Sequence, residues 1–219
     1  MQRIQRHLRR RAQRAQRRAS VDEQRAPAAA TPILHTLRSS LAYLLVSRDG
    51  AMLRPGTRSY ARAWIRDGAM ISEALLRLGH PAVAAEFLRW FAPHQFASGK
   101  VPCCVDAHGA GPVPEHDSHG QLAFLAREVY RYTKDRASLR EVWPRVLAAM
   151  RYQRELRHSE RTSANTSPQR RALWGLLPPS ISHEGYSAKP AYSYWDDFWG
   201  LRGLADAAAL AAELGDPSA

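Results

Sequence analysis

The sequence has few cysteines, no long apolar run and no zinc-type spacing, and each absence excludes a class of protein. Only two of the 219 residues are cysteine, the neighbours Cys103 and Cys104, so no disulfide framework is expected. No apolar stretch approaches the ~20 residues that span a bilayer, so no membrane partner is expected. The histidines near the cysteines, His108, His116 and His119, do not have the spacing of a zinc site. The sequence therefore predicts a cytoplasmic protein in a reducing setting, with no metal or other cofactor.

Positive charge is concentrated at the start of the chain. The formal net charge is +12, which on its own would suit a nucleic-acid-binding protein. Residues 1–25 carry nine Arg against two acidic residues, or +7, and the remaining +5 is spread over the rest of the chain. Residues 1–31 are therefore predicted to be a basic tail, which lacks the apolar core of a secretory signal. Three interpretations stay open for it: a disordered arm, an extension upstream of the true start, or an arm that binds nucleic acid or targets an organelle. Nucleic acid is not expected as a partner of the remaining chain, which has no basic stripe.

After this tail, apolar residues recur every three to four positions, as in amphipathic helices. Six helices are expected, beginning near Leu34, Asp67, Pro81, Ser118, Ser138 and Asp196. Asp67 has the residue type of an N-cap. Ser118 with Gln121, and likewise Ser138 with Glu141, fits the capping-box pattern. No segment alternates as a strand does, so the predicted class is all-α, with three antiparallel helical hairpins and no sheet.

The first candidate motif is Trp64-Ile65-Arg66-Asp67, at a loop-to-helix junction. An aromatic ring, a guanidinium and a carboxylate placed together can stack on a sugar face and form paired hydrogen bonds to its hydroxyls. A purely structural role stays open, in which Asp67 caps the helix and pairs with Arg66.

The second motif, Glu115-His116-Asp117-Ser118-His119, ends a long loop that covers residues 97–117. Long loops in compact domains are usually functional or disordered, and this one is rich in chemically active side chains. Asp117 is expected just before the first turn of the following helix. The motif fits either a solvated cap or a loop that contacts a sugar.

The third motif lies in and after a second long loop, residues 176–194. It consists of His183-Glu184-Gly185-Tyr186 and of Tyr192-Ser193-Tyr194-Trp195-Asp196-Asp197-Phe198-Trp199. Apolar surroundings and a neighbouring like charge both raise the pKa of a carboxyl group. The general acid of glycoside cleavage needs such a shift, because it must hold a proton near neutral pH. The alternative is structural: two acids favoured at a helix N-terminus and aromatic residues of the core.

Taken in order, the three motifs resemble the six-hairpin glycosidases, which include glucoamylases and trehalases. The resemblance covers about residues 33–214. It rests on Trp-x-Arg-Asp-Gly-Ala at 64–69, Pro-Glu-x-Asp-Ser-x-Gly-Gln at 114–121 and Trp-Asp-Asp-Phe-Trp at 195–199. Glucoamylases usually have Pro at the position of Ile65, and Trp-Glu-Glu where this chain has Trp195-Asp196-Asp197. The resemblance implies an (α/α)6 toroid, with an inner and an outer ring of six helices each. Residues 32–219 would form its N-terminal half, or about three of six hairpins.

The resemblance also implies roles for single residues. Asp196 would be the general acid of a glycoside hydrolase that cleaves an oligo- or polysaccharide with inversion. Residues expected to bind the carbohydrate substrate are Trp64, Arg66, Asp67, Asp117, Glu184, Trp195 and Asp197. The family carries the catalytic base on a later helix, beyond Ala219, so this chain alone is expected to lack it. The alternative is a catalytically inactive carbohydrate-binding or scaffold protein of the same fold.

Overall fold

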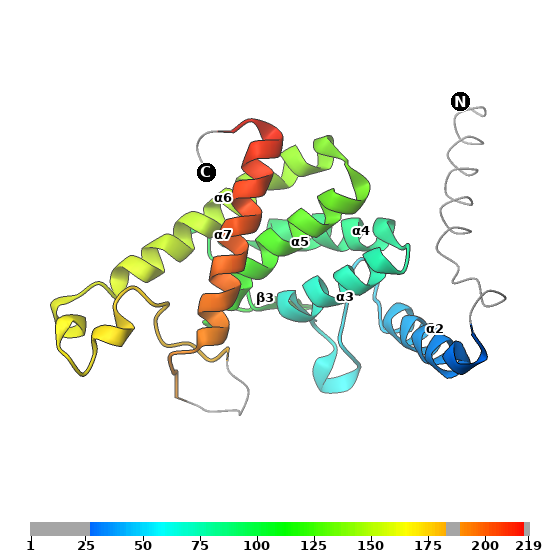
Figure 1. The fold of residues 1–219 in the computed structure, drawn as a ribbon, viewed down its shortest axis with the longest axis horizontal. Coiled ribbons are helices and arrows are strands. Elements are labelled where there is room, and N and C mark those ends of the chain that lie inside the picture. Colours follow the sequence, from blue (N-terminus) through cyan, green and yellow to red (C-terminus); the bar gives the residue numbers. More distant parts are fainter. Residues whose placement is uncertain (1–26, 183–188, 217–219) are drawn as a thin grey trace.

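The computed structural model describes residues 27–182 and 189–216, and most of these residues are helical (Figure 1). The α-helices are α2 (Thr31–Val46), α3 (Ile65–Arg77), α4 (Pro81–Phe91), α5 (Asp117–Thr133), α6 (Arg136–Ser159) and α7 (Tyr194–Leu214). Short 3-10 turns lie at Ala28–Ala30, Arg58–Tyr60, Ala92–His94, Ser163–Thr166 and Arg171–Leu173. The expected predominance of helix is confirmed. Among the described residues, no helix combines the length and the apolar character that crossing a membrane requires.

A small sheet corrects the expectation of no strands. Strand β1 (Ala63–Trp64) pairs antiparallel with β2 (Cys104–Asp106), and β2 pairs antiparallel with β3 (Gly109–Ala110). The strands have only two or three residues each, too few for an alternating pattern to show in the sequence. The backbone N–H of Ile65 donates to the carbonyl oxygen of Cys103 at 3.1 Å, so the sheet leads directly into the start of α3.

Five of the six expected helix starts differ from the observed ones by one to three residues, and only the start at Pro81 matches. Helix α3 begins at Ile65, so Asp67 lies in its first turn and is not the N-cap. Helix α5 begins at Asp117, and the hydroxyl of Ser118 caps nothing. Helix α6 begins at Arg136, because Asp135 accepts hydrogen bonds from the N–H groups two and three residues later. In α5 and α6 the Ser of the supposed capping box therefore lies inside the helix.

Helices α3, α5 and α7 form one layer with their amino ends together. Helices α5 and α7 run in the same direction: the N–H of Asp117 meets Asp196 at one end, and the hydroxyl of Tyr130 donates to Glu213 at the other. The two backbones approach closely at Gly120, where a Cβ atom would collide with the carbonyl oxygen of Trp199. In Figure 1 the amino ends of the three helices lie close together near β3, and the helices diverge from there.

Helices α4 and α6 pack against this layer as the second members of two antiparallel hairpins. Near the start of α3, Gly68 lies against the ring of Phe87 in the second half of α4. Near the start of α5, the ring of His119 lies 5.1 Å from that of Tyr152, towards the end of α6. Two hairpins of the expected kind are thus present, whereas α2 buries only Leu34.

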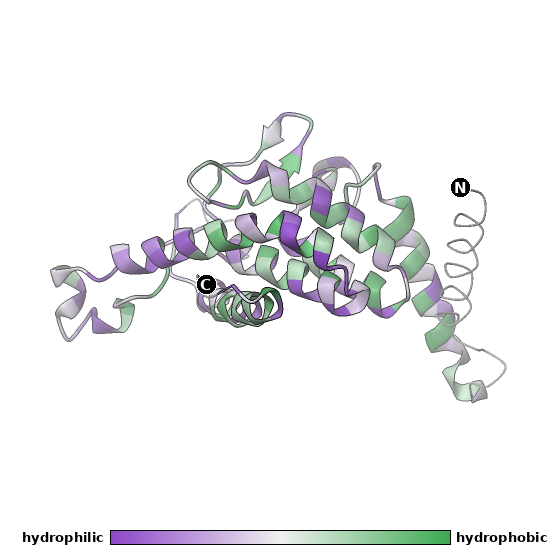
Figure 2. Cartoon of the chain, turned by 90° about the horizontal axis from the view of Figure 1, so that it is seen from above, coloured by the Kyte–Doolittle hydropathy of each residue, from purple (hydrophilic) through white to green (hydrophobic). Residues whose placement is uncertain are grey.

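The core lies between these layers. Its largest fully buried apolar side chains on α3, α4, α5 and α7 are Ile65, Leu75, Leu76, Phe87, Phe91, Leu122, Leu125 and Leu210. The last turns of α6 extend beyond this core and are mostly hydrophilic, at the left of Figure 2. The core thus fixes α3, α5 and α7 relative to one another, and with them the side chains at their amino ends.

Candidate functional site

One hydrogen-bonded network joins the amino ends of α3, α5 and α7. The Nε atom of Arg66 on α3 donates to Oδ2 of Asp117 at 2.7 Å, and its terminal nitrogen donates to Glu115 at 2.9 Å. The indole N–H of Trp195 on α7 donates to the same Asp117 oxygen at 2.8 Å. Arg66, Asp117 and Trp195 are far apart in sequence, so the fold itself assembles this network.

Asp196 lies beneath the network and ties it to the loop before α7. Its Oδ1 accepts the backbone N–H of Asp117 at 3.1 Å, and its Oδ2 accepts the hydroxyl of Ser180 at 2.6 Å. The hydroxyl of Ser180 also lies 3.1 Å from that of Ser182, and the backbone oxygen of Ser182 accepts from Arg66. Asp196 is only 1% exposed, so both of its oxygens face protein groups.

Two carboxyl groups of the site keep a proton to unusually high pH. Burial raises the pKa of Glu115 to about 7, although the charge of Arg66 acts in the opposite sense. Burial also raises the pKa of Asp196 to about 6, against the hydrogen bonds from Ser180 and Ser182 that lower it. Burial raises the pKa of Asp197 as well. Perturbed carboxyl pKa values gathered in one place are typical of functional sites, although structural ion pairs also produce them.

Arg66 is the cation that balances these carboxyls. Burial lowers its pKa, but its hydrogen bond to Asp117 and the nearby charges of Asp117, Glu115 and Asp67 raise the pKa above its usual range. The guanidinium therefore stays charged. It also lies 5.8 Å from the centre of the Trp195 ring, within the range of a cation–π contact.

The expected site residues do not all join this network. Arg66, Asp117, Trp195 and Asp196 do, and Asp67 acts on Arg66 through its charge. The other two described residues make separate contacts. The ring of Trp64 lies 6.0 Å from that of Tyr60, and an oxygen of Asp197 accepts the backbone N–H of Leu177 at 3.0 Å. Glu184 lies outside the described residues.

Several buried polar atoms at the starts of α5 and α7 have no hydrogen-bond partner: oxygens of Asp117, Ser118 and Asp197, Nδ1 of His116 and Nε2 of His119. The other ring nitrogen of His119 accepts the backbone N–H of Val101 at 3.3 Å. Oδ1 of Asp117 is one of these oxygens, in a residue with 0% exposure, and Oδ2 of Asp197 is another. Burial lowers the pKa of His116 to about 4 and that of His119 to about 3, so both rings are neutral at pH 7. Buried polar groups are normally paired, so these orphaned atoms mark a place where a ligand or water belongs.

Sequence reasoning did not select Glu115, Ser180 or Ser182 as site residues. Glu115 lies within a motif that the sequence does single out, two residues before Asp117. The serines follow Pro178-Pro179 in the second long loop, and the position of Ser180 is set by its backbone pairing with Ala191. Only the length of that loop pointed to them.

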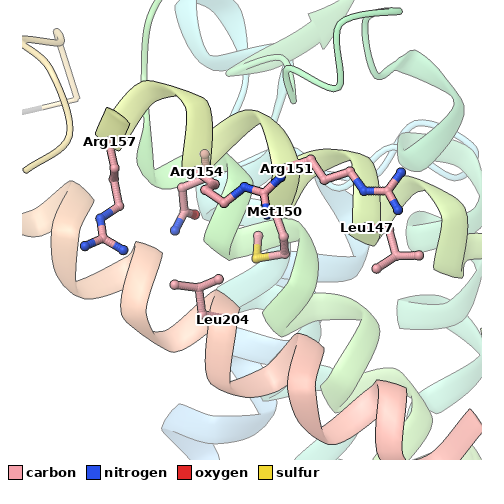
Figure 3. Close-up of a pocket in the computed structure, with 7 residues that line it drawn as sticks. Leu147, Met150, Arg151, Arg154, Arg157 and Leu204 are labelled. Carbon is pink, nitrogen blue, oxygen red and sulfur yellow. The ribbon is translucent and has the colours of Figure 1, made fainter. Parts of the chain in front are cut away.

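No metal centre is apparent in the described part of the chain, where no three His, Cys, Asp or Glu side chains are placed to hold an ion. The thiols of Cys103 and Cys104 are buried, free and 3.3 Å apart. A groove of about 290 Å³ lies between α6 and α7, where Arg151, Arg154 and Arg157 line α6 opposite Leu204 (Figure 3). No carboxylate lines this groove, so it offers no acid or base chemistry.

Comparisons with family models, with curated proteins and with solved structures find no match for this chain. Function must therefore be argued from the site itself.

Proposed function

We propose that this chain belongs to a carbohydrate-active protein of the (α/α)6 toroid class, a glycoside hydrolase that cleaves an oligo- or polysaccharide with inversion. The observation that carries the proposal is the network of Arg66, Asp117, Trp195 and Asp196 at one shared end of α3, α5 and α7. The three motifs on which the resemblance to six-hairpin glycosidases rests all contribute to it.

The arrangement of the helices supports the same class. In such a toroid the inner helices run in one direction, and the outer helices return along them. Helices α3, α5 and α7 would be inner helices, and α4 and α6 would be outer ones. The amino ends of the inner helices would surround the sugar.

The chemistry of the network suits a neutral sugar. Oδ1 of Asp117 has no partner but lies in a residue with 0% exposure, so a hydroxyl would reach it only after neighbouring side chains move, while Arg66 holds the other oxygen in place. Trp195 is 40% exposed, so a part of its ring is open for stacking on a sugar face. Inversion requires a carboxylic acid that protonates the leaving oxygen and a carboxylate base that activates water, roughly 6.5–9.5 Å apart. Asp196, to which the resemblance assigns the acid, and Glu115 both hold a proton near neutral pH.

A second candidate function is a carbohydrate-binding or scaffold protein of the same class without activity. The burial of Asp196 favours it, because a carboxyl with both oxygens occupied cannot approach a leaving oxygen as it stands. Only the hydrolase would cleave the sugar, whereas both candidate functions require that a sugar binds.

Binding is therefore the test of the shared proposal. We expect saturable binding of a neutral α- or β-linked glucoside or disaccharide, measured by saturation-transfer NMR over a panel of sugars. Trp195→Ala should weaken it by up to about tenfold, because an aromatic stacking contact contributes about 0.5–1.5 kcal/mol. Trp174→Ala is the matched control, since Trp174 is similarly exposed at 46% but outside the network. Failure of every sugar to bind, or equal losses in both variants, would overturn the proposal.

A further inference from the structure

Asp196 is poorly placed to exchange a proton with a bound sugar. A general acid must come within about 2.6–3.2 Å of the oxygen that it protonates. One oxygen of Asp196 accepts the N–H of Asp117 and the other accepts the hydroxyl of Ser180, in a residue with 1% exposure. The bonds connect the start of α7 to the start of α5 and to the loop before α7. This is the geometry of a carboxylate that holds other groups in position.

Glu115 is placed differently. Its Oε2 atom accepts from Arg66 at 2.9 Å, whereas Oε1 has no hydrogen-bond partner and is not among the buried unpartnered atoms of the described residues. The side chain is 13% exposed, so it is partly shielded from water and still reachable. Glu115 also shares Arg66, whose side chain is 23% exposed, with Asp117. A sugar bound over the exposed part of Arg66 would therefore lie within reach of Glu115.

We propose that Glu115 is the group that exchanges the proton with the bound sugar, and that Asp196 is a positioning residue which holds Asp117 and the amino end of α5. This assignment rests on the proposed function. In the forward reaction, the carboxylic acid of Glu115 gives its proton to the glycosidic oxygen as the bond to the anomeric carbon breaks. The bonding electron pair leaves with that oxygen, and Glu115 becomes a carboxylate paired with Arg66. Water supplies a hydroxyl to the anomeric carbon, and its second proton goes to a carboxylate base.

The surroundings of Glu115 agree with this role. The charged and titratable groups that act on it come from each neighbouring element: Arg66 from α3, Asp117 from α5, Asp196 from α7 and Cys104 from β2. Burial is the largest influence and raises the pKa of Glu115 to about 7, which leaves the proton available for transfer near neutral pH. Arg66 opposes this shift and stabilises the carboxylate that forms after transfer.

A sugar analogue of fixed charge separates the two carboxyls. The probe is a gluco-configured iminosugar with a quaternary, permanently cationic ring nitrogen, and the neutral lactam of the same ring is its control. Calorimetric titration of the wild-type chain should show cation affinity rising about tenfold between pH 5.5 and pH 8.5, with a midpoint near 7, as Glu115 loses its proton. Affinity for the lactam should change little over the same range.

Variants then assign the titration to one residue. The affinity of Glu115→Gln for the cation should not rise between pH 5.5 and pH 8.5. Glu115→Asp should restore part of that rise. Asp196→Asn should weaken both probes at every pH but keep the midpoint near 7, as a positioning residue would. Ser180→Ala, which removes one hydrogen bond of Asp196, should behave in the same way if Asp196→Asn does not fold.

The outcomes distinguish the two proposals. If neither probe bound to the wild-type chain at any pH, the proposed function would fail. Suppose instead that both probes bound to the wild-type chain. If Glu115→Gln kept the full rise of cation affinity with pH, or if Asp196→Asn or Ser180→Ala removed that rise, the assignment of Glu115 would be overturned. The proposed sugar site would not be affected.

Discussion

Helices α5 and α6 follow one another in the chain and begin in opposite ways. At the start of α6, the exposed carboxylate of Asp135 accepts the N–H groups of Ala137 and Ser138 at 3.0 and 3.1 Å. At the start of α5, no side chain of the N-cap residue His116 bonds the helix. The N–H of Asp117 is instead accepted by Asp196, from a helix 79 residues later. The first start is made by its own sequence, and the second by tertiary contacts.

The difference extends to burial and to unpaired groups. Asp135 is exposed and Ser138 half-buried, and their side chains bond one another, whereas Asp117, Ser118 and His119 are fully buried, each with an unpartnered polar atom. Buried polar groups without partners cost stability. Proteins break local rules in this way chiefly at functional sites. The start of α5 thus carries an energetic cost that the start of α6 does not, as expected if the proposed site lies there.

The largest expected effect comes from separating α5 from α7. A Cβ atom on Gly120 would collide with the backbone of Trp199, which cannot move as a side chain can. We expect Gly120→Ala to lower the free energy of unfolding by about 5 kcal/mol or more, at the extreme of single substitutions. Urea denaturation measures it, with Gly56→Ala as control, because a Cβ there meets only Tyr60 at 3.4 Å. A loss below about 1 kcal/mol would mean that the two helices do not touch here.

Removing each helix-start carboxylate should sharpen the contrast. Asp117→Ala leaves Arg66 without its main partner in a partly buried place, so we expect a loss of about 4 kcal/mol. Asp135→Ala removes an exposed N-cap, so we expect a loss of about 1 kcal/mol. Chemical denaturation of both variants checks the difference. The double variant Asp117→Leu with Arg66→Met should recover more than half of the stability that Asp117→Ala loses. Equal losses for Asp117→Ala and Asp135→Ala would contradict the difference between the two helix starts.

The two carboxylates that accept first-turn N–H groups should also titrate with opposite signs. Burial raises the pKa of Asp196 from 3.8 to about 6, so the folded state binds more protons between these values. Its contribution to stability therefore falls as pH rises from about 4 to about 6, by up to about 3 kcal/mol. Hydrogen bonds from Ser138 lower the pKa of Asp135, so its contribution is present above pH 3.8 and is lost as pH falls below that value.

Stability differences between each variant and the wild-type chain isolate these contributions. Differences are needed because His116 and His119 have lowered pKa values and add stability as pH rises towards 6.5. The deficit of Asp196→Asn relative to the wild-type chain should shrink from pH 4 to pH 7, and that of Asp135→Asn should grow from pH 2.5 to pH 5. The same sign in both series would contradict the account.

The smallest effect concerns the two serines that the capping-box pattern singled out. The hydroxyl of Ser118 is buried without a partner, so Ser118→Ala should change stability by less than about 0.5 kcal/mol, or raise it. The hydroxyl of Ser138 donates to Asp135 at 2.7 Å in an exposed place, so Ser138→Ala should lose a similarly small amount. A loss above about 1 kcal/mol in Ser118→Ala would show that its hydroxyl has a partner after all.

The same contrast explains what the sequence could predict. Helix ends that depend on neighbouring residues were accessible: Gly79 and Pro81 separate α3 from α4, and Gly215 in a left-handed conformation ends α7. Arg66, Asp117 and Asp196 each lie at or near a helix start after a loop, and such starts can share one end in alternating hairpins, so their meeting was partly accessible from the sequence. The roles of Glu115, Ser180 and Ser182 depend on how a long loop folds back onto α5, which no local pattern encodes. Trp64 and Asp197 have the right residue types and make other contacts.

The most direct test of the carbohydrate site is a crystal structure of the chain with the cationic iminosugar bound. The account predicts a sugar hydroxyl within about 3.2 Å of Oδ1 of Asp117, the oxygen that now lacks a partner, and the sugar ring against Trp195. Glu115 should be the carboxyl nearest to the ring nitrogen. A sugar bound elsewhere, such as in the arginine-lined groove between α6 and α7, with Asp117 unchanged, would contradict the account.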